Sequence, residues 1–201
     1  MALRLPLRPS LPASLETVVV EPATLIRVSG HDTGEPYFGR RNVNRFDDPN
    51  ADPALRFGTC YVGSSLAVAV AETILHDRKP VKGKFQVEPS VIRSRYVVHF
   101  TGDPLKLTNL TGSALKRIGG HAGLTGTPSY ATPKRWSVAI HAHPDDVDGF
   151  VYMSRHLNDE KAVILFDRAG AKLWMASASA LHAHPEFGQV ARDLAIGFPG
   201  A

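Results

Sequence analysis

Residues 64–75 read Ser-Ser-Leu-Ala-Val-Ala-Val-Ala-Glu-Thr-Ile-Leu, and nearly all of these side chains are small or aliphatic. Either Ser64 or Ser65 suits an N-cap, so the stretch predicts a helix in the protein core that runs to about Asp77. Glu72 is the one charged residue in the stretch. Because an unpaired charge in a protein interior is costly, we expect Glu72 to have a partner or to serve a reaction.

The composition is that of an ordinary globular protein. The chain has 201 residues, 43% of them hydrophobic, and a formal net charge of +4, which suffices for one domain with a full core. The basic residues are dispersed, so no direct nucleic-acid contact is indicated. The single cysteine, Cys60, excludes an internal disulfide and indicates a buried structural thiol. Without a visible secretory signal or an 18-residue apolar segment, we expect a cytoplasmic protein that does not contact membranes.

Short strands and a few helices alternate without a regular βαβ pattern, which predicts an α+β fold rather than a doubly wound sheet. Strands are expected at residues 17–20, 24–28, 57–62, 91–100, 105–110, 149–152, 162–166 and 172–176. Besides the helix from residue 64, helices are expected at 111–118, at 134–142 and near Ala191.

The domain organisation is simple. Residues 1–15 are rich in proline and predict an N-terminal extension, whereas residues 16–201 predict a single domain. Within this domain, residues 30–53 hold many Gly, Asn, Asp and Pro and few aliphatic residues. Such a long loop in a compact domain is usually functional.

One histidine motif offers an alternative function. Residues 142–146, Ala-His-Pro-Asp-Asp, resemble the zinc motif of PIG-L type deacetylases, but Val147 stands where that motif has its glutamate base. A zinc deacetylase that uses His143 and Asp146 is therefore kept as an alternative function. Two H-x-H pairs, 141/143 and 182/184, lack a third ligand nearby and are interpreted as surface or partly buried histidines.

The glycine-rich stretch 119–126 lacks both the strand–G-x-G-x-x-G–helix setting and the G-K-[ST] ending of a nucleotide loop. We interpret it as a flexible loop.

A larger constellation surrounds Glu72. An early arginine, Arg27, follows an apolar pair, and Tyr61 precedes Glu72 by eleven positions. Residues 148–156 read Asp-Gly-Phe-Val-Tyr-Met-Ser-Arg-His, and an apolar strand and Phe-Asp follow them. From about Leu25 to Asp167 this pattern resembles the RES domain, a family named for its Arg, Glu and Ser.

The resemblance implies a fold similar to ADP-ribosyltransferases, with a core of short, mostly antiparallel strands in one catalytic domain over residues 16–201. It also implies a toxin of a toxin–antitoxin pair, controlled by an Xre-like antitoxin. Characterised relatives degrade NAD, several by phosphorolysis, so NAD and inorganic phosphate are the expected substrates. No other cofactor and no metal is expected.

The resemblance also implies the site. Glu72, Tyr61, Arg45 and Ser154 are the expected catalytic residues, with Arg56 as an alternative to Arg45 because the family's Gly-Gly-Arg-Trp-Asn segment is replaced here by Asn-Arg-Phe-Asp. The residues expected to bind the dinucleotide are Arg27, Arg56, Ser64, Arg155 and His156.

These residue types suit cleavage of the nicotinamide–ribose bond. Nicotinamide leaves as a neutral molecule, so the reaction needs a negative charge near an oxocarbenium-like sugar more than it needs an acid. Glu72 can supply that charge, and arginine forks can hold phosphates. Tyr61 can stack on the nicotinamide or bond the ribose, and Ser154 can bond a phosphate or the ribose. A protein-directed ADP-ribosyltransferase and a non-catalytic binding module remain open.

Overall fold

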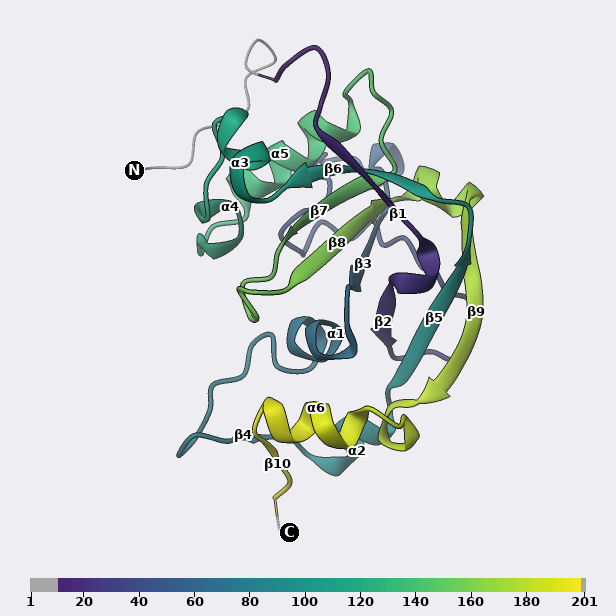
Figure 1. Cartoon of the computed structure of the whole chain (residues 1–201), viewed down its shortest axis with the longest axis vertical. Coiled ribbons are helices and arrows are strands. Elements are labelled where there is room, and N and C mark those ends of the chain that lie inside the picture. Colours follow the sequence, from purple (N-terminus) through teal and green to yellow (C-terminus); the bar gives the residue numbers. More distant parts are fainter. Residues whose placement is uncertain (1–10, 200–201) are drawn as a thin grey trace.

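Eight strands form one curled sheet in the computed structural model, which describes residues 11–199 (Figure 1). The strand order is β1-β6-β7-β8-β3-β2-β5-β9, and each neighbouring pair is antiparallel except β6–β7. The bounds are β1 Thr17–Val20, β2 Ile26–Ser29, β3 Thr59–Gly63, β5 Tyr96–Gly102, β6 Leu105–Leu110, β7 Gly149–Met153, β8 Lys161–Phe166 and β9 Leu173–Ala180. The predicted α+β class with a mostly antiparallel sheet is confirmed.

The sheet nearly divides between β2 and β3. Along its other edge β3 pairs with β8 over all five of its residues, but with β2 it pairs only at Ile26 and Gly63. At the far end of β3, Gly39 of the long loop bonds Thr59 in place of β2. The gap between these two contacts is where the sheet opens, and α1 packs against both strands beside it.

Helix α1, Leu66–Thr73, forms because its sequence has a strong start and an apolar body. The hydroxyl of Ser65 accepts a hydrogen bond from the backbone N–H of Val68, and five of the eight residues are buried. A Cβ at Gly63 would lie 2.9 Å from the Ala69 nitrogen, so glycine permits the close approach of β3 to α1. The helix ends before the expected Asp77 because the Val70 carbonyl accepts the N–H groups of both Ile74 and Leu75.

The other helices cover the two ends of the sheet (Figure 1). Helices α3 (Gly112–Arg117), α4 (Gly123–Gly126) and α5 (Ala131–His141) lie at the end near β6 and β7, and Trp136 of α5 is buried in that core. At the opposite end α2 (Pro89–Arg93) and α6 (Phe187–Asp193) pack beneath α1 with the short pair β4 (Phe85–Gln86) and β10 (Ile196–Gly197). Short 3-10 turns at Pro22–Thr24, Pro53–Leu55, Asp167–Ala171 and Leu181–Ala183 complete the connections.

Several expected elements differ from the structure in their extent. The expected strand 91–100 begins only at Tyr96, because Pro89 occupies the first helical position and starts α2 instead. The glycine-rich loop is interrupted by α4, and α5 begins three residues before Lys134.

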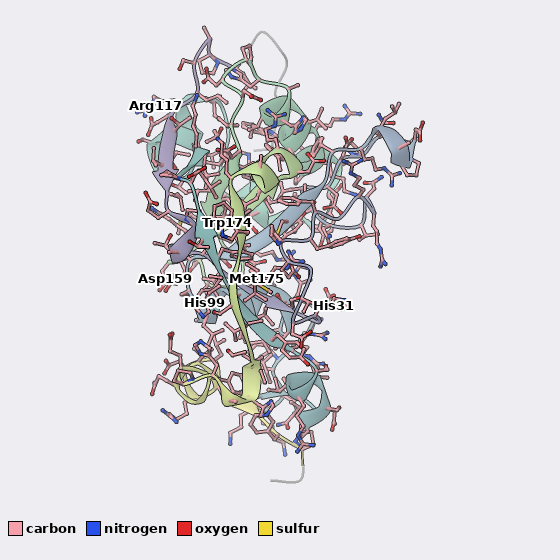
Figure 2. All side chains as sticks on the ribbon, turned by 90° about the vertical axis from the view of Figure 1, so that its right-hand side faces the viewer. His31, His99, Arg117, Asp159, Trp174 and Met175 are labelled. Carbon is pink, nitrogen blue, oxygen red and sulfur yellow. The ribbon has the colours of Figure 1, made fainter. Side chains whose placement is uncertain are left out.

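Part of the expected N-terminal extension, residues 1–10, lies outside the described residues. The rest docks on the loop after α5: the Leu15 N–H donates to Asp145 Oδ2 at 2.6 Å, and the Leu15 side chain is buried. Strand β9 forms one edge of the sheet, with Trp174 52% exposed, and Figure 2 faces this edge. Within residues 11–199 no helix has the length and apolar character needed to span a membrane.

The cap of α1 gives a test of how this helix is held. Replacing Ser65→Ala removes the bond to Val68 N–H and should lower the free energy of unfolding by about 1 kcal/mol. Urea denaturation measures this change. The matched control is Ser113→Ala, in which an exposed serine within α3 is replaced and little change is expected. Equal effects of the two substitutions would contradict the assigned cap.

Candidate active site

A cavity of about 920 Å³ opens where β2 and β3 diverge. Residues of β2, β3, α1, the loop from residue 30 to 47 and Arg155 after β7 line it. Five arginines are among the lining residues: Arg27, Arg41, Arg45, Arg95 and Arg155. A cavity near the upper end of the usual range for ligand sites, about 300–1,000 Å³, with several cations in its wall suits a large anionic ligand.

Glu72 brings a carboxylate from the last turn of α1 to this cavity. Its Oε1 accepts a hydrogen bond from Ser154 Oγ at 2.5 Å. The Ser154 oxygen in turn accepts the backbone N–H groups of His156 (3.1 Å) and Leu157 (3.2 Å). Ser154 is 1% exposed and is absent from the cavity wall. The serine therefore orients Glu72, while the glutamate faces the ligand space.

Arg45 lines the cavity and is only partly satisfied by its neighbours. One of its terminal nitrogens donates to the Thr127 carbonyl at 2.7 Å, and its guanidinium lies 4.6 Å from the centre of the Tyr130 ring. The other terminal nitrogen is buried without a hydrogen-bond partner within residues 11–199. Burial, and then the charge of Arg155, lowers the pKa of Arg45. Both observations fit a group arranged to receive an anion.

Arg27 differs from Arg45 because its charge is already paired. Its Nε lies 3.1 Å from Glu35 Oε1, and a terminal nitrogen donates to Cys60 Sγ (2.9 Å) and to the Tyr61 carbonyl (3.3 Å). Burial opposes its charged form, but Cys60 and Glu35 outweigh burial and raise the pKa of Arg27. Arg27 thus links β2 to β3 and supports the cavity wall, with its charge neutralised by Glu35.

Tyr61 is held by a buried acid that the sequence did not single out. The Tyr61 hydroxyl donates to Asp47 Oδ1 at 3.1 Å and accepts the Phe46 N–H at 3.0 Å. Asp47 also accepts from the Thr59 hydroxyl and from the N–H groups of Val43 and Asn44. The long loop is therefore tied to β3, and the Tyr61 ring, not its hydroxyl, remains to contact a ligand. An aspartate within a loop rich in asparagine was the only sequence signal for this role.

Two expected binding residues lie away from the cavity. The Arg56 guanidinium donates to the carbonyls of Asn50, Arg40 and Ala51, and so organises the loop in which it stands. Ser64 is exposed, and its hydroxyl donates to the Lys161 carbonyl at 2.7 Å. Of the two arginines left open by the sequence, the structure brings Arg45 and not Arg56 to the cavity with Glu72.

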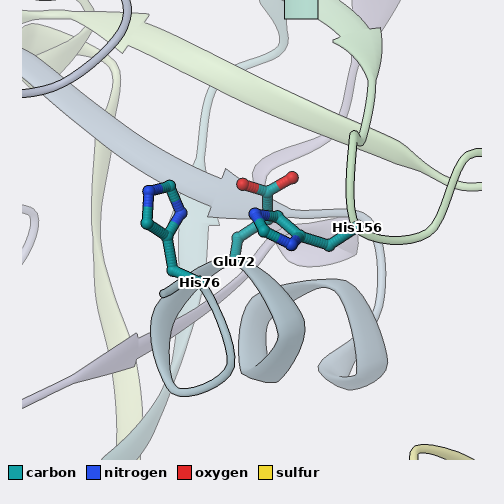
Figure 3. Close-up of side chains that lie close together, drawn as sticks. All are labelled: Glu72, His76 and His156. Carbon is teal, nitrogen blue, oxygen red and sulfur yellow. The ribbon is translucent and has the colours of Figure 1, made fainter. Parts of the chain in front are cut away.

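The two residues after Ser154 take different positions. Arg155 is exposed and lines the cavity. His156 turns towards the end of α1, where its ring centre lies 5.1 Å from that of His76 (Figure 3). Burial lowers the pKa of His156, although the neighbouring Glu72 charge acts in the opposite direction. His76 was missed from the sequence, where only its spacing of four from Glu72 marked it.

The deacetylase alternative is not supported by the geometry. His143 Nε2 lies 3.0 Å from the Pro12 carbonyl, and its Nδ1 accepts the Asp145 N–H, so both ring nitrogens are engaged. The Asp146 side chain is exposed and forms an ion pair with Arg168. His143 and Asp146 therefore do not form a common ligand set.

The expected buried thiol is present: Cys60 is fully buried, and burial raises the pKa of its thiol to about 11.

Comparison with known proteins places these residues in context. The family model named RES domain matches residues 24–187. "Probable toxin y4kH" of Sinorhizobium fredii (strain NBRC 101917 / NGR234) is 36% identical over 78 residues, which are 39% of this chain and 61% of that protein. The chain thus spans about three fifths of the length of this curated relative.

Among solved structures, the chain is similar to one chain of the M. tuberculosis MbcT-MbcA toxin-antitoxin complex, a crystal structure. The TM-score is 0.64 over 90% of this chain and 94% of the matched chain, with 14% sequence identity. At this identity the match demonstrates a shared fold and nothing finer.

The buried phenols predict how stability depends on alkaline pH. Burial raises the pKa of both Tyr61 and Tyr152 well above the usual value for tyrosine. The charge of Asp47 adds to this effect at Tyr61, and the charge of Glu72 adds to it at Tyr152. In the unfolded chain tyrosine ionises at about pH 10. The stability that these groups contribute is thus complete below that pH and decreases as the pH rises further.

The Tyr61→Phe variant tests this in an alkaline titration followed by tyrosinate absorbance. Below the unfolding transition its absorbance should rise as much as that of the wild type, and across the transition it should rise less. A smaller rise in the variant while the protein is still folded would show that Tyr61 ionises in place.

Proposed function

Because the chain belongs to the RES domain family, we propose that it is a toxin enzyme that breaks the nicotinamide–ribose bond of NAD. The relatives support the toxin part of the proposal: one is named a probable toxin, and one belongs to a toxin–antitoxin complex. The observation that carries the catalytic part is the Glu72 carboxylate, which is oriented by Ser154 and faces a cavity lined by arginines.

Glu72 fits the electrostatic requirement of this bond cleavage. When the bond between nicotinamide and C1 of the ribose breaks, its electron pair goes to the pyridinium nitrogen, and positive charge develops on the sugar. A carboxylate beside the sugar stabilises this charge, as carboxylates do in glycoside hydrolysis. Its partly buried position increases the effect because charges interact more strongly in a low dielectric.

The arginines supply the complementary part of the site. Arg45 has an unpartnered buried nitrogen for an anion, and Arg155 adds a second guanidinium at the cavity wall. We propose that these two groups hold the pyrophosphate of NAD or an incoming phosphate. Arg27, paired with Glu35, supports them, and the Tyr61 ring provides an apolar surface for the nicotinamide or the ribose.

The proposed acceptor is inorganic phosphate. A phosphate oxygen forms the new bond to the ribose C1, and the products are nicotinamide and a phosphorylated ADP-ribose. The proposed partner is an antitoxin that covers the long loop 30–53 and so closes the cavity. This loop contributes Arg45 and much of the cavity wall, so a protein bound there would exclude the substrate.

The Glu72→Gln variant tests the role of the carboxylate. Glutamine retains the shape and a hydrogen-bond acceptor for Ser154 but loses the charge, so nicotinamide release from NAD should decrease by about 100-fold or more. Chromatography of nicotinamide measures the rate, and circular dichroism checks the fold. The matched control is Glu88→Gln at an exposed position, which should retain wild-type activity. Full activity of Glu72→Gln would refute the proposed role.

The acceptor is identified by product masses with and without added phosphate. Phosphorolysis predicts that nicotinamide release requires phosphate and that the sugar product carries the additional phosphoryl group. Release without phosphate, with ADP-ribose as the product, would indicate water as the acceptor. Transfer of ADP-ribose to an added protein fraction would instead favour a protein-directed ADP-ribosyltransferase.

A further inference from the structure

We propose that Glu72, His76 and His156 form a zinc-binding site at the wall of the cavity, and that bound Zn²⁺ removes the Glu72 carboxylate from the reaction. The inhibitory part rests on the proposed function, whereas the metal site itself does not. The three side chains converge from two segments: Glu72 in the last turn of α1 with His76 in the turn after it, and His156 in the loop after β7 (Figure 3).

The geometry is that of a nearly assembled site. One ligand atom from each of the three side chains lies within 4.8 Å of the other two. In a tetrahedral site with bonds of about 2.0–2.2 Å, ligand atoms are separated by about 3.3–3.5 Å. Small side-chain rotations therefore suffice to close the site. Two histidines and a glutamate are also a familiar ligand set for zinc sites that keep a fourth position open.

The local backbone shows where these residues come from. Glu72 lies in the last turn of α1, and His76 lies in the turn that follows the helix, four positions further along the chain. The His156 N–H donates to Ser154 Oγ, and the same hydroxyl donates to Glu72. Ser154 thus orients the Glu72 carboxylate, as outer groups do in metal sites, and fixes the backbone from which His156 projects. It occupies only one carboxylate oxygen and leaves the other to face a ligand.

An independent observation points to a missing partner. His156 Nε2 is buried and has no hydrogen-bond partner within residues 11–199. A buried polar atom without a partner costs free energy, and coordination to a metal would satisfy it. His76 has the exposed Asp77 carboxylate 3.7 Å from its Nε2, so an acid is also available beside this ring.

The charges near the site limit its affinity. Arg45 and Arg155 act electrostatically on His156, and both oppose a cation there. We therefore expect reversible binding in the micromolar range, weaker than at structural zinc sites. Mg²⁺ should not compete, because it prefers six oxygen ligands.

In the described part of the chain, Glu72, His76 and His156 are the one group of three His, Cys, Asp or Glu side chains whose ligand atoms lie close enough together to hold a metal ion. His99 and His184 form only a pair, with their Nε2 atoms 3.5 Å apart.

Calorimetric titration of the protein with Zn²⁺, in the absence of NAD, tests the metal site. The wild type should bind one Zn²⁺ per chain, and Mg²⁺ should give no signal. The variants His76→Ala and His156→Ala should each bind Zn²⁺ at least about 10-fold more weakly, since even the loss of an outer group costs that much. His182→Ala, at an exposed position, is the matched control and should bind as the wild type does. Thermal unfolding checks that each variant is folded.

Two calorimetric results would overturn the metal site: no Zn²⁺ binding by the wild type, or binding that survives both His76→Ala and His156→Ala and is lost in His184→Ala.

The proposed inhibition by Zn²⁺ is tested separately. For each variant, the rate of nicotinamide release with Zn²⁺ is compared with the rate of the same variant without Zn²⁺. Zn²⁺ should inhibit the wild type and His182→Ala, and His76→Ala should resist it at the same concentration. An active wild type that binds Zn²⁺ at the triad without inhibition would disprove the inhibitory part. A wild type that binds Zn²⁺ but never releases nicotinamide would instead disprove the proposed function and leave the metal site supported.

Discussion

The structure depends on one constraint: a single carboxylate stands on a helix that is otherwise apolar. Helix α1 packs against β2 and β3 and buries five of its eight residues, and Glu72 in its last turn lines the cavity. This cavity opens at the gap where β2 and β3 are joined at only one pair of residues. The division of the sheet, the cavity and the position of the acid are therefore aspects of one arrangement. The hydroxyl of Ser154 completes it by holding one carboxylate oxygen.

The buried acids of the long loop serve structure, and this leaves Arg45 free for function. Asp47 accepts bonds from two hydroxyl groups and two backbone N–H groups, and Glu35 accepts from the Ser29 hydroxyl and the Tyr37 N–H while it neutralises Arg27. Both acids are fully engaged within the protein and cannot also neutralise Arg45. An arginine held by one carbonyl and one aromatic ring, but by no acid, retains its attraction for an external anion.

The sequence predicted the elements better than the site. The apolar run with a serine cap identified α1, and the β-branched runs identified most strands, because these signals are local. The first half of the strand expected at 91–100 is wrong because the helix-starting effect of Pro89 outweighed β propensity. The choice between Arg45 and Arg56 depended on how a loop of more than twenty residues folds back, which no local pattern encodes. His76 was missed because a lone histidine after a helix is informative only once the partner from residue 156 is in place.

The position of Glu72 makes its possible roles mutually exclusive. Ser154 occupies Oε1, so a ribose hydroxyl and a metal ion would compete for the remaining lone pairs of one carboxylate. This competition is reciprocal: a metal ion would lower the affinity for the sugar ligand by the same factor by which that ligand lowers the affinity for the metal ion. The Ser154 hydroxyl accepts the backbone N–H of His156 and donates to Glu72. The serine therefore links the loop after β7 to the acid on α1, so the position of that acid depends on both segments.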